Sequence, residues 1–182
     1  MKLRIRTERK NMKKNVVLTA IMLIFLLSAC DSGQKIKREY LVSTDLSAVN
    51  IDGILLGDFV DQIDLTKYTD VDSDSFEEKE NTFYFQELHI ETDVNGCIQE
   101  VRGNIYGHIA EYESVLFSVN GIDNPASINE IVNILGQNHN EYWFDKEQKI
   151  KAYTFYDNNN MIYATFTFND NSNELAWIIL SK

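Results

Sequence analysis

Four segments that alternate like β-strands follow one another near the end of the chain, and they constrain the fold more than any other feature. Turns rich in asparagine and aspartate separate the last three of them, and such turns join neighbouring antiparallel strands. We therefore expect an antiparallel meander. Its predicted strands are Glu141 to Asp145, Ile150 to Asp157, Met161 to Asn169 and Glu174 to Ser181.

The last predicted hairpin assigns residues to the two faces of this meander. A turn closed between Asn169 and Glu174 pairs Phe168 with Leu175, and the face that carries this pair is expected to pack on a helix. The register adds the pairs Phe166 with Trp177 and Ala164 with Ile179 to that face, and it places Tyr163, Thr165, Thr167, Ala176, Ile178 and Leu180 on the other.

That other face is more apolar than a solvated surface usually is, so we expect something to cover it. Most aromatic residues are expected in the sheet core, but some can form an exposed patch for a protein partner. An acidic rim would favour a basic partner. The candidate partner surface consists of Tyr142, Trp143, Tyr163, Ile178 and Leu180.

A helix is predicted immediately before the meander. Ser127 and Glu130 form a capping box, and Gly136 marks the end of the helix. Apolar residues at helical spacing lie between them, at Ile128, Ile131, Ile134 and Leu135.

The first half of the chain shows the same order of elements in weaker form. A two-turn helix is predicted over residues 58–64 with Asp58 as its N-cap. Strands are expected near 82–92, 98–106 and 112–119. The predicted fold class is therefore α+β and sheet-dominated. It consists of two helix-then-antiparallel-meander units, residues 46–120 and 121–182.

Asn95 and Gly96 give the strongest hairpin signal in the sequence. A two-residue turn there pairs Leu88 with Gly103 and Ile90 with Val101, which form an apolar face. The opposite, polar face carries His89, Glu91, Glu100 and Arg102, and His89 is expected to be solvent-exposed.

The N-terminus has the layout of a bacterial export signal. Basic residues precede an uncharged run, Val16 to Ala29, that is shorter than the roughly 20 residues of a membrane span. Leu27-Ser28-Ala29-Cys30 resembles the lipobox of bacterial lipoproteins. This resemblance implies a signal peptide over residues 1–29 and a lipid anchor at Cys30, with fatty-acyl chains such as palmitate. The alternatives are an uncleaved N-terminal membrane anchor and an ordinary signal with an incidental cysteine.

Residues 30–45 are expected to form a flexible tether to the folded part. The short helices next to glycine in "GILLGDFVDQI" and "INEIVNILGQ", each followed by a meander, resemble the SmpA/OmlA-like lipoproteins and the beta-lactamase-inhibitor-protein fold. This resemblance implies a binding module of the cell envelope.

The charge of the chain excludes some partners. Seven of the 17 basic residues and one of the 28 acidic residues lie in residues 1–29, so residues 30–182 carry 10 basic and 27 acidic residues and a formal charge of −17. Such a surface repels phosphate backbones, and nucleic-acid binding is not expected. If Cys30 is acylated, Cys97 has no cysteine to pair with and is expected to be a small filler residue.

Metal binding and catalysis have little support in the sequence. Asp70, Asp72 and Asp74 match an EF-hand start, but Ser75 and Asn81 occupy positions where glycine and glutamate are needed, so at most weak divalent-cation binding is expected. The three histidines, His89, His108 and His139, are scattered, and none of the common catalytic motifs occurs.

We therefore expect no enzyme, no cofactor and no metal centre, but a lipid-anchored binding module on the extracytoplasmic face of a cell membrane. The alternatives are an inhibitor or accessory of a cell-wall enzyme, and a hydrolase with an unrecognised site.

Overall fold

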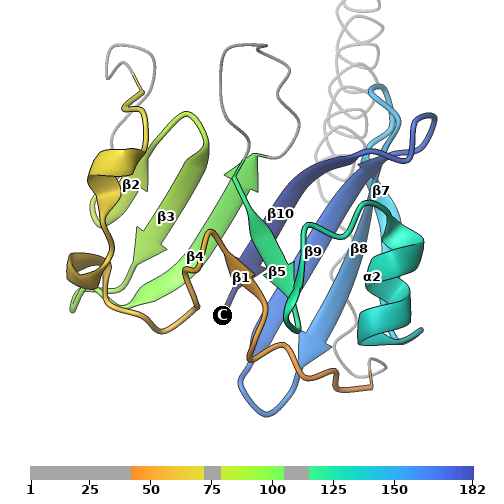
Figure 1. Ribbon diagram of the computed structural model, residues 1–182, viewed down its shortest axis with the longest axis horizontal. Coiled ribbons are helices and arrows are strands. Elements are labelled where there is room, and N and C mark those ends of the chain that lie inside the picture. The colour runs from red at the N-terminus through yellow and green to blue at the C-terminus, as the bar shows by residue number, and fades with distance from the viewer. Residues whose placement is uncertain (1–41, 72–78, 105–114) are drawn as a thin grey trace, which may run out of the picture. The chain divides into compact units, whose positions relative to one another are not determined.

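A seven-stranded antiparallel sheet dominates the computed structural model, which describes residues 42–71, 79–104 and 115–182 (Figure 1). Its strand order is β2-β3-β4-β10-β9-β8-β7. The first and second halves of the chain meet in its middle, where β4 pairs with β10. The strands are β2 (Thr82–Tyr84), β3 (Leu88–Thr92), β4 (Ile98–Asn104), β7 (Asn140–Asp145), β8 (Ile150–Asp157), β9 (Ile162–Asn169) and β10 (Leu175–Ser181).

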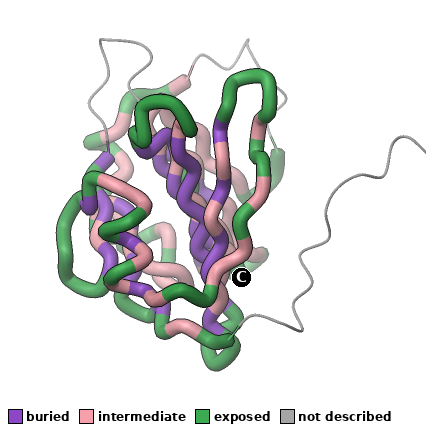
Figure 2. The backbone as a smooth tube through the Cα atoms, turned by 90° about the vertical axis from the view of Figure 1, so that its right-hand side faces the viewer, coloured by how far each residue is buried: buried purple, intermediate pink, exposed green. Residues whose placement is uncertain are grey.

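A second layer covers one face of this sheet, which we call the inner face (Figure 1). It consists of the helix α2 (Ile128–Leu135) and a small sheet of β1 (Asn50–Ile51), β5 (Phe117–Val119) and β6 (Ile122–Asp123). Ile51 and Ile131 of this layer are fully buried in one cluster with Phe166 and Ile178 of the large sheet. We call the opposite face of the large sheet the outer face. Figure 2 shows buried backbone concentrated in the central strands.

Gly103 permits the close approach of the two layers. A Cβ atom built on this residue would lie 2.7 Å from Val115 Cγ2 and 3.0 Å from Ile51 Cγ2. Real Cβ contacts are not this short, so a larger residue in the middle of β4 would push the small sheet away. The position therefore requires glycine for packing.

The predicted helix before the second meander is confirmed as α2. The Ser127 hydroxyl accepts a hydrogen bond from the backbone N–H of Glu130 at 3.3 Å, as a capping residue does. Gly136 ends the helix with a φ of 93°, which a residue with a side chain rarely adopts. Ile131 and Leu135 are buried against the large sheet.

The predicted first helix is wrong. Residues 58–64 contain only the 3-10 turn η3 (Val60–Gln62), and a second turn, η4 (Leu65–Lys67), follows it. The backbone of this segment pairs with the β3-β4 hairpin: Ile98 N–H donates to Asp58 O, and Val60 N–H donates to Gly96 O. The Asp58 carboxylate accepts from Leu55 N–H at 2.9 Å and caps no helix.

The prediction of two helix-then-meander units is therefore not supported. In the described part of the chain α2 is the only α-helix. The strand that was expected at the end of the first meander, β5, belongs to the small sheet instead. The coarser prediction of a sheet-dominated chain with antiparallel strands is confirmed.

The hairpin at Asn95-Gly96 keeps the predicted register away from its turn. Leu88 pairs with Gly103 and Ile90 pairs with Val101. Near the turn the register shifts, and Thr92 pairs with Ile98. The Asp93 carboxylate accepts hydrogen bonds from the N–H groups of Asn95 and Cys97, and Gly96 has a φ of 80°. The loop is thus longer than the predicted two residues, because the Asp93 side chain stabilises a wider turn.

Residues 43–46 are bound to the folded part, although residues 43–45 were predicted to belong to the flexible tether. Thr44 N–H donates to Tyr156 O at 2.8 Å, and the Ser43 hydroxyl accepts from Asn158 N–H at 2.9 Å. Leu46 N–H donates to the carboxylate of Asp157 at 3.1 Å. The remainder of the predicted tether, residues 30–41, and the predicted signal peptide with Cys30 lie outside the described residues.

Asp157 is a buried carboxylate that organises the turn after β8. Only 1% of its surface is exposed. It accepts hydrogen bonds from the backbone N–H groups of Leu46, Asn159 and Asn160 and from the Asn160 side chain. Burial by itself would raise the pKa of Asp157, but the hydrogen bonds from Asn160, Leu46 and Asn159 together keep it below the usual value. Asp157 therefore stabilises the turn that follows β8.

Candidate interaction site on the outer sheet face

A bulge in β10 decides which residues reach the outer face. Leu175 pairs with Phe168 as predicted, but the register then shifts and Trp177 pairs with Thr167. The Thr167 hydroxyl accepts a hydrogen bond from Trp177 N–H at 2.9 Å and donates one to Trp177 O at 3.3 Å. These two bonds stabilise a bulge with one extra residue between Leu175 and Trp177. Because of this extra residue, the side chains that follow it point to the opposite face from the one predicted.

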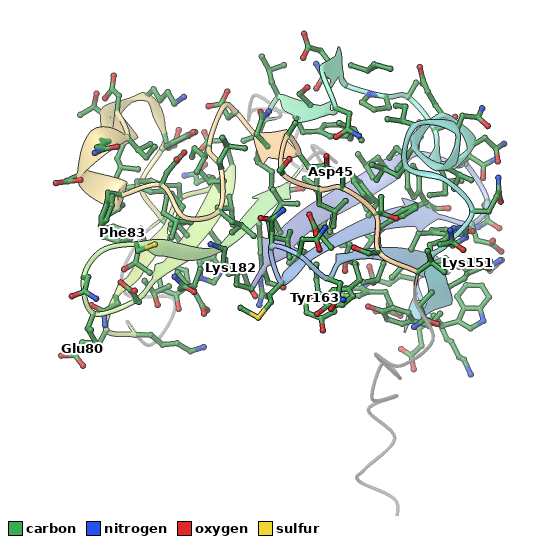
Figure 3. The ribbon with its side chains drawn as sticks, turned by 90° about the horizontal axis from the view of Figure 1, so that it is seen from below. Asp45, Glu80, Phe83, Lys151, Tyr163 and Lys182 are labelled. Atoms are coloured by element: carbon green, nitrogen blue, oxygen red, sulfur yellow. The ribbon has the colours of Figure 1, made fainter. Side chains whose placement is uncertain are left out.

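The bulge in β10 and the alternation along β7 correct the candidate partner surface that was predicted from the sequence. Ile178 and Leu180 are exposed by only 0% and 1%, because they belong to the core of the inner face. Trp143 lies on the same side of the sheet as Lys151, its cross-strand partner, whereas Tyr142 lies on the outer face. Of the five predicted residues, the outer face therefore presents only Tyr142 and Tyr163. Figure 3 shows Tyr163 on the side of the sheet away from α2.

Aromatic side chains nevertheless gather on the outer face of β7 to β10. Tyr156 and Tyr163 stack with ring centroids 4.6 Å apart, and Phe144 and Trp177 lie 6.1 Å apart. Phe144 is 49% exposed. We define the aromatic outer face by the alternation along these strands as Tyr142, Phe144, Tyr156, Tyr163, Trp177 and Ile179.

Small residues fill the floor between these side chains. Ala152, Thr154, Thr165 and Thr167 are all buried. The hydroxyls of Thr154 and Thr165 bond to each other at 2.8 Å, and the hydroxyl of Thr167 is used by the bulge. Because the hydroxyls of all three threonines have partners within the sheet, the floor is apolar in effect and suits an apolar contact surface.

The outer face of β2 to β4 differs, because it is charged as predicted. Arg102 forms an ion pair with Glu100, and His89 Nε2 lies 3.5 Å from Glu91 Oε1. His89 is only partly exposed, in contrast to the prediction, because it stacks on Tyr84 with ring centroids 4.7 Å apart.

The pKa of His89 is lowered below its usual value. Burial is the largest cause, and the positive charge of Arg102 is the next. Glu91 and Glu100 act in the opposite direction but do not cancel these effects. A histidine in this state is neutral near pH 7, and the polar side of the outer face therefore carries one positive and two negative charges from Arg102, Glu91 and Glu100.

Metal and catalytic candidates are not brought together in the described ranges. No group of three or more His, Cys, Asp or Glu side chains that could hold a metal ion occurs among those residues. His139 packs between Tyr153 and Phe155, far along the sheet from His89. The Cys97 thiol donates to Gly57 O at 3.5 Å. His108 and Asp72 to Glu78 of the acidic segment lie outside the described residues.

Phe144, Trp177 and Ile179 belong to this surface but were not among the residues predicted for it. Phe144 could have been found, because it shares a strand face with Tyr142 by simple alternation. Trp177 and Ile179 could not have been found in this way, because their orientation depends on a bulge that the residues of the turn do not predict.

Comparisons with known proteins give no further guidance. No family model, no curated protein and no solved structure matches this chain. The resemblance to SmpA/OmlA-like lipoproteins thus rests on the sequence pattern alone. No helix in the part of the chain that is described is long and apolar enough to cross a membrane.

Proposed function

We propose that this chain is a lipid-anchored extracytoplasmic protein without catalytic activity that binds a protein partner through the aromatic outer face. The observation that carries the proposal is the largely uncharged, aromatic surface on β7 to β10. Its members have apolar bodies, and such side chains supply much of the binding energy in protein interfaces.

The contrast in charge supports this proposal. Residues 30–182 have a formal charge of −17, yet the outward positions of β7 to β10 carry only one charged side chain, Asp145 at the end of β7. Charged residues are depleted at the centres of protein interfaces. The flanking Glu91 and Glu100 on the polar side favour a partner whose apolar patch has basic neighbours.

The proposed location at a membrane follows from the lipobox-like segment. A diacylated cysteine at position 30 would hold the chain stably at a membrane surface, because two acyl chains bind far more tightly than one. The acidic surface would keep the folded part away from anionic headgroups. The proposed partner is therefore another protein of the cell envelope.

One experiment tests the face. The full chain is expressed with an affinity tag in a bacterial host, and its partners are captured from detergent-solubilised membranes. The variant Tyr163→Asp/Trp177→Asp should lose a partner that the parent retains, since buried charges are costly in an interface. The control Leu116→Asp, at a side chain 59% exposed elsewhere, should retain it. Equal capture by all three proteins would refute the proposed face.

A second experiment tests the anchor. Cys30→Ser should move the protein from the membrane fraction to the soluble fraction and abolish labelling by a fatty-acid analogue. Unchanged labelling and fractionation would refute the lipid anchor.

A further inference from the structure

The two edges of the seven-stranded sheet are built differently. At the β2 edge the chain segment that precedes β2 pairs with the residues that directly follow this strand: Asp70 forms a bridge with Phe85, and Gln86 N–H donates to Thr69 O at 2.9 Å. At the other edge β7 pairs with β8 alone among the described residues. Within the described residues, the free side of β7 therefore has no backbone partner for its N–H and C=O groups.

β7 lacks two of the common devices that protect an edge strand. Natural edge strands are often blocked by proline or lysine, and β7, with the sequence Asn-Glu-Tyr-Trp-Phe-Asp, contains neither. Its register shifts between Trp143 and Asp145, so the regular ladder extends from Asn140 to Trp143. An added strand can thus pair over a short length.

Exposed aromatic residues flank the edge on both faces of the sheet. Trp143 is 40% exposed and Phe144 is 49% exposed, and the two point to opposite faces. A strand added beside β7 would cover part of both, with its own side chains alternating between the same two faces. Burying such surface contributes roughly 25 cal/mol per Å².

The charges at this edge favour a basic occupant. Lys151 lies 2.9 Å from Asp170 and 3.2 Å from Glu141, and hydrogen bonds to these two carboxylates raise its pKa. With Lys146 and Lys149 of the adjoining turn included, the four carboxylates of Glu141, Asp145, Glu147 and Asp170 exceed the three lysines at this edge by one charge. Figure 3 shows Lys151 at this end of the sheet. Since the whole chain is acidic as well, a second copy is a poorer match than a basic partner.

We infer that β7 receives an extended segment of the partner, in which basic and apolar residues alternate, as an eighth strand of the sheet. This inference rests on the proposed function, because the same partner would contact Tyr142 and Phe144 on the aromatic outer face. It adds that backbone hydrogen bonds of β7, and not side chains alone, hold the partner.

The test uses the full chain in detergent micelles and a synthetic peptide of about ten residues, the length of a long strand, in which lysine and valine alternate. Hydrogen exchange followed by mass spectrometry should show new protection over residues 140–145. The same peptide with N-methyl groups on alternate backbone nitrogens keeps its charge but cannot pair as a strand, and it should give no protection.

Variants of β7 test whether the peptide binds at this edge or at another exposed surface. Trp143→Lys/Phe144→Lys should weaken peptide binding by about tenfold or more with an unchanged melting temperature. Leu116→Lys, which also adds a charge at an exposed apolar position, should bind as the parent does.

Three results would overturn the inference: equal binding of the methylated peptide, protection confined to β9 and β10, or a dimer that Trp143→Lys dissolves. If the peptide protects β7 while Tyr163→Asp/Trp177→Asp retains every captured protein, the edge stands and the proposed face fails.

Discussion

Over β7 to β10 both faces of the large sheet are largely apolar, yet only the inner face is covered by the rest of the described fold. Ile178 and Ile179 are neighbours in β10, but one is completely buried in the core and the other is partly exposed on the outer face. The inner face carries aliphatic and phenylalanine side chains that pack against α2 and the small sheet. Apart from Phe144 and Ile179, the aromatic outer face and its floor consist mainly of tyrosine, tryptophan and threonine, whose polar groups tolerate water. Hydrophobicity alone therefore does not say which face of a sheet forms the core.

The largest expected loss of stability comes from placing an aspartate on the inner face of β10, and the same substitution on the outer face is its control. Ile178→Asp should destabilise the protein by about 4 kcal/mol or more, because it buries an unpaired charge. Ile179→Asp, one residue further, should cost about 1 kcal/mol or less. Urea unfolding followed by circular dichroism measures both. Similar losses for the two variants would contradict the assigned register of β10.

The second prediction concerns Asp157, a buried polar residue at the end of β8. Asp157→Asn should lower the free energy of unfolding by about 3 kcal/mol at pH 7, because the carboxylate accepts several hydrogen bonds while buried. Its folded pKa is depressed, so its contribution is present above the unfolded pKa of about 3.9 and is lost as the pH falls through the folded pKa.

The stability difference between the parent and Asp157→Asn should therefore shrink below about pH 4, which urea unfolding at several pH values measures. A difference that does not depend on pH would show that the charge of Asp157 contributes nothing.

The third prediction concerns Gly103, where the small sheet packs closely on the inner face. Gly103→Ala should destabilise the protein by about 1–3 kcal/mol, because the new methyl group meets Val115 and Ile51. Adding Val115→Ala removes the closest atom, so the double variant should lose less than the two single losses added together. Additive losses in thermal unfolding would place the strain elsewhere.

Thr167 tests the bulge that separates the faces, and the expected effect is smaller. Thr167→Val keeps the shape but removes both hydrogen bonds to Trp177, and it should cost about 1–2 kcal/mol. The near-ultraviolet circular dichroism of Trp177 should change as well. Thr92→Val, whose hydroxyl makes one long exposed bond of 3.4 Å, should have an effect below about 0.5 kcal/mol. Equal effects of the two variants would show that the hydroxyl of Thr167 does not stabilise the bulge.

The local features of the fold were predictable where they depend on nearby residues. α2 followed from the Ser127 cap and the glycine at 136, and the second meander followed from its turns. The register of β3 and β4 was correct wherever alternation set it, at Ile90 and Val101.

The remaining features depend on distant partners. Residues 58–64 have a helical pattern, but they pair with a hairpin that begins some 30 residues later in the chain, and no local pattern encodes that choice. The same is true of the candidate site. Tyr142 and Tyr163 were identified from their residue types, whereas the orientation of Trp177 depends on a hydroxyl in the neighbouring strand.

The contact between Leu46 and Asp157 spans 111 positions, and the central pair of strands joins β4 to β10 at the very end of the chain. Contacts between residues so far apart in sequence require long loops to close first, and such topologies fold slowly. The first hairpin can form early, but it remains an incomplete sheet with an open edge until the last strand has been added. The large sheet is therefore expected to be complete only when β10 is available, and intermediates that lack β10 are expected to be prone to aggregation.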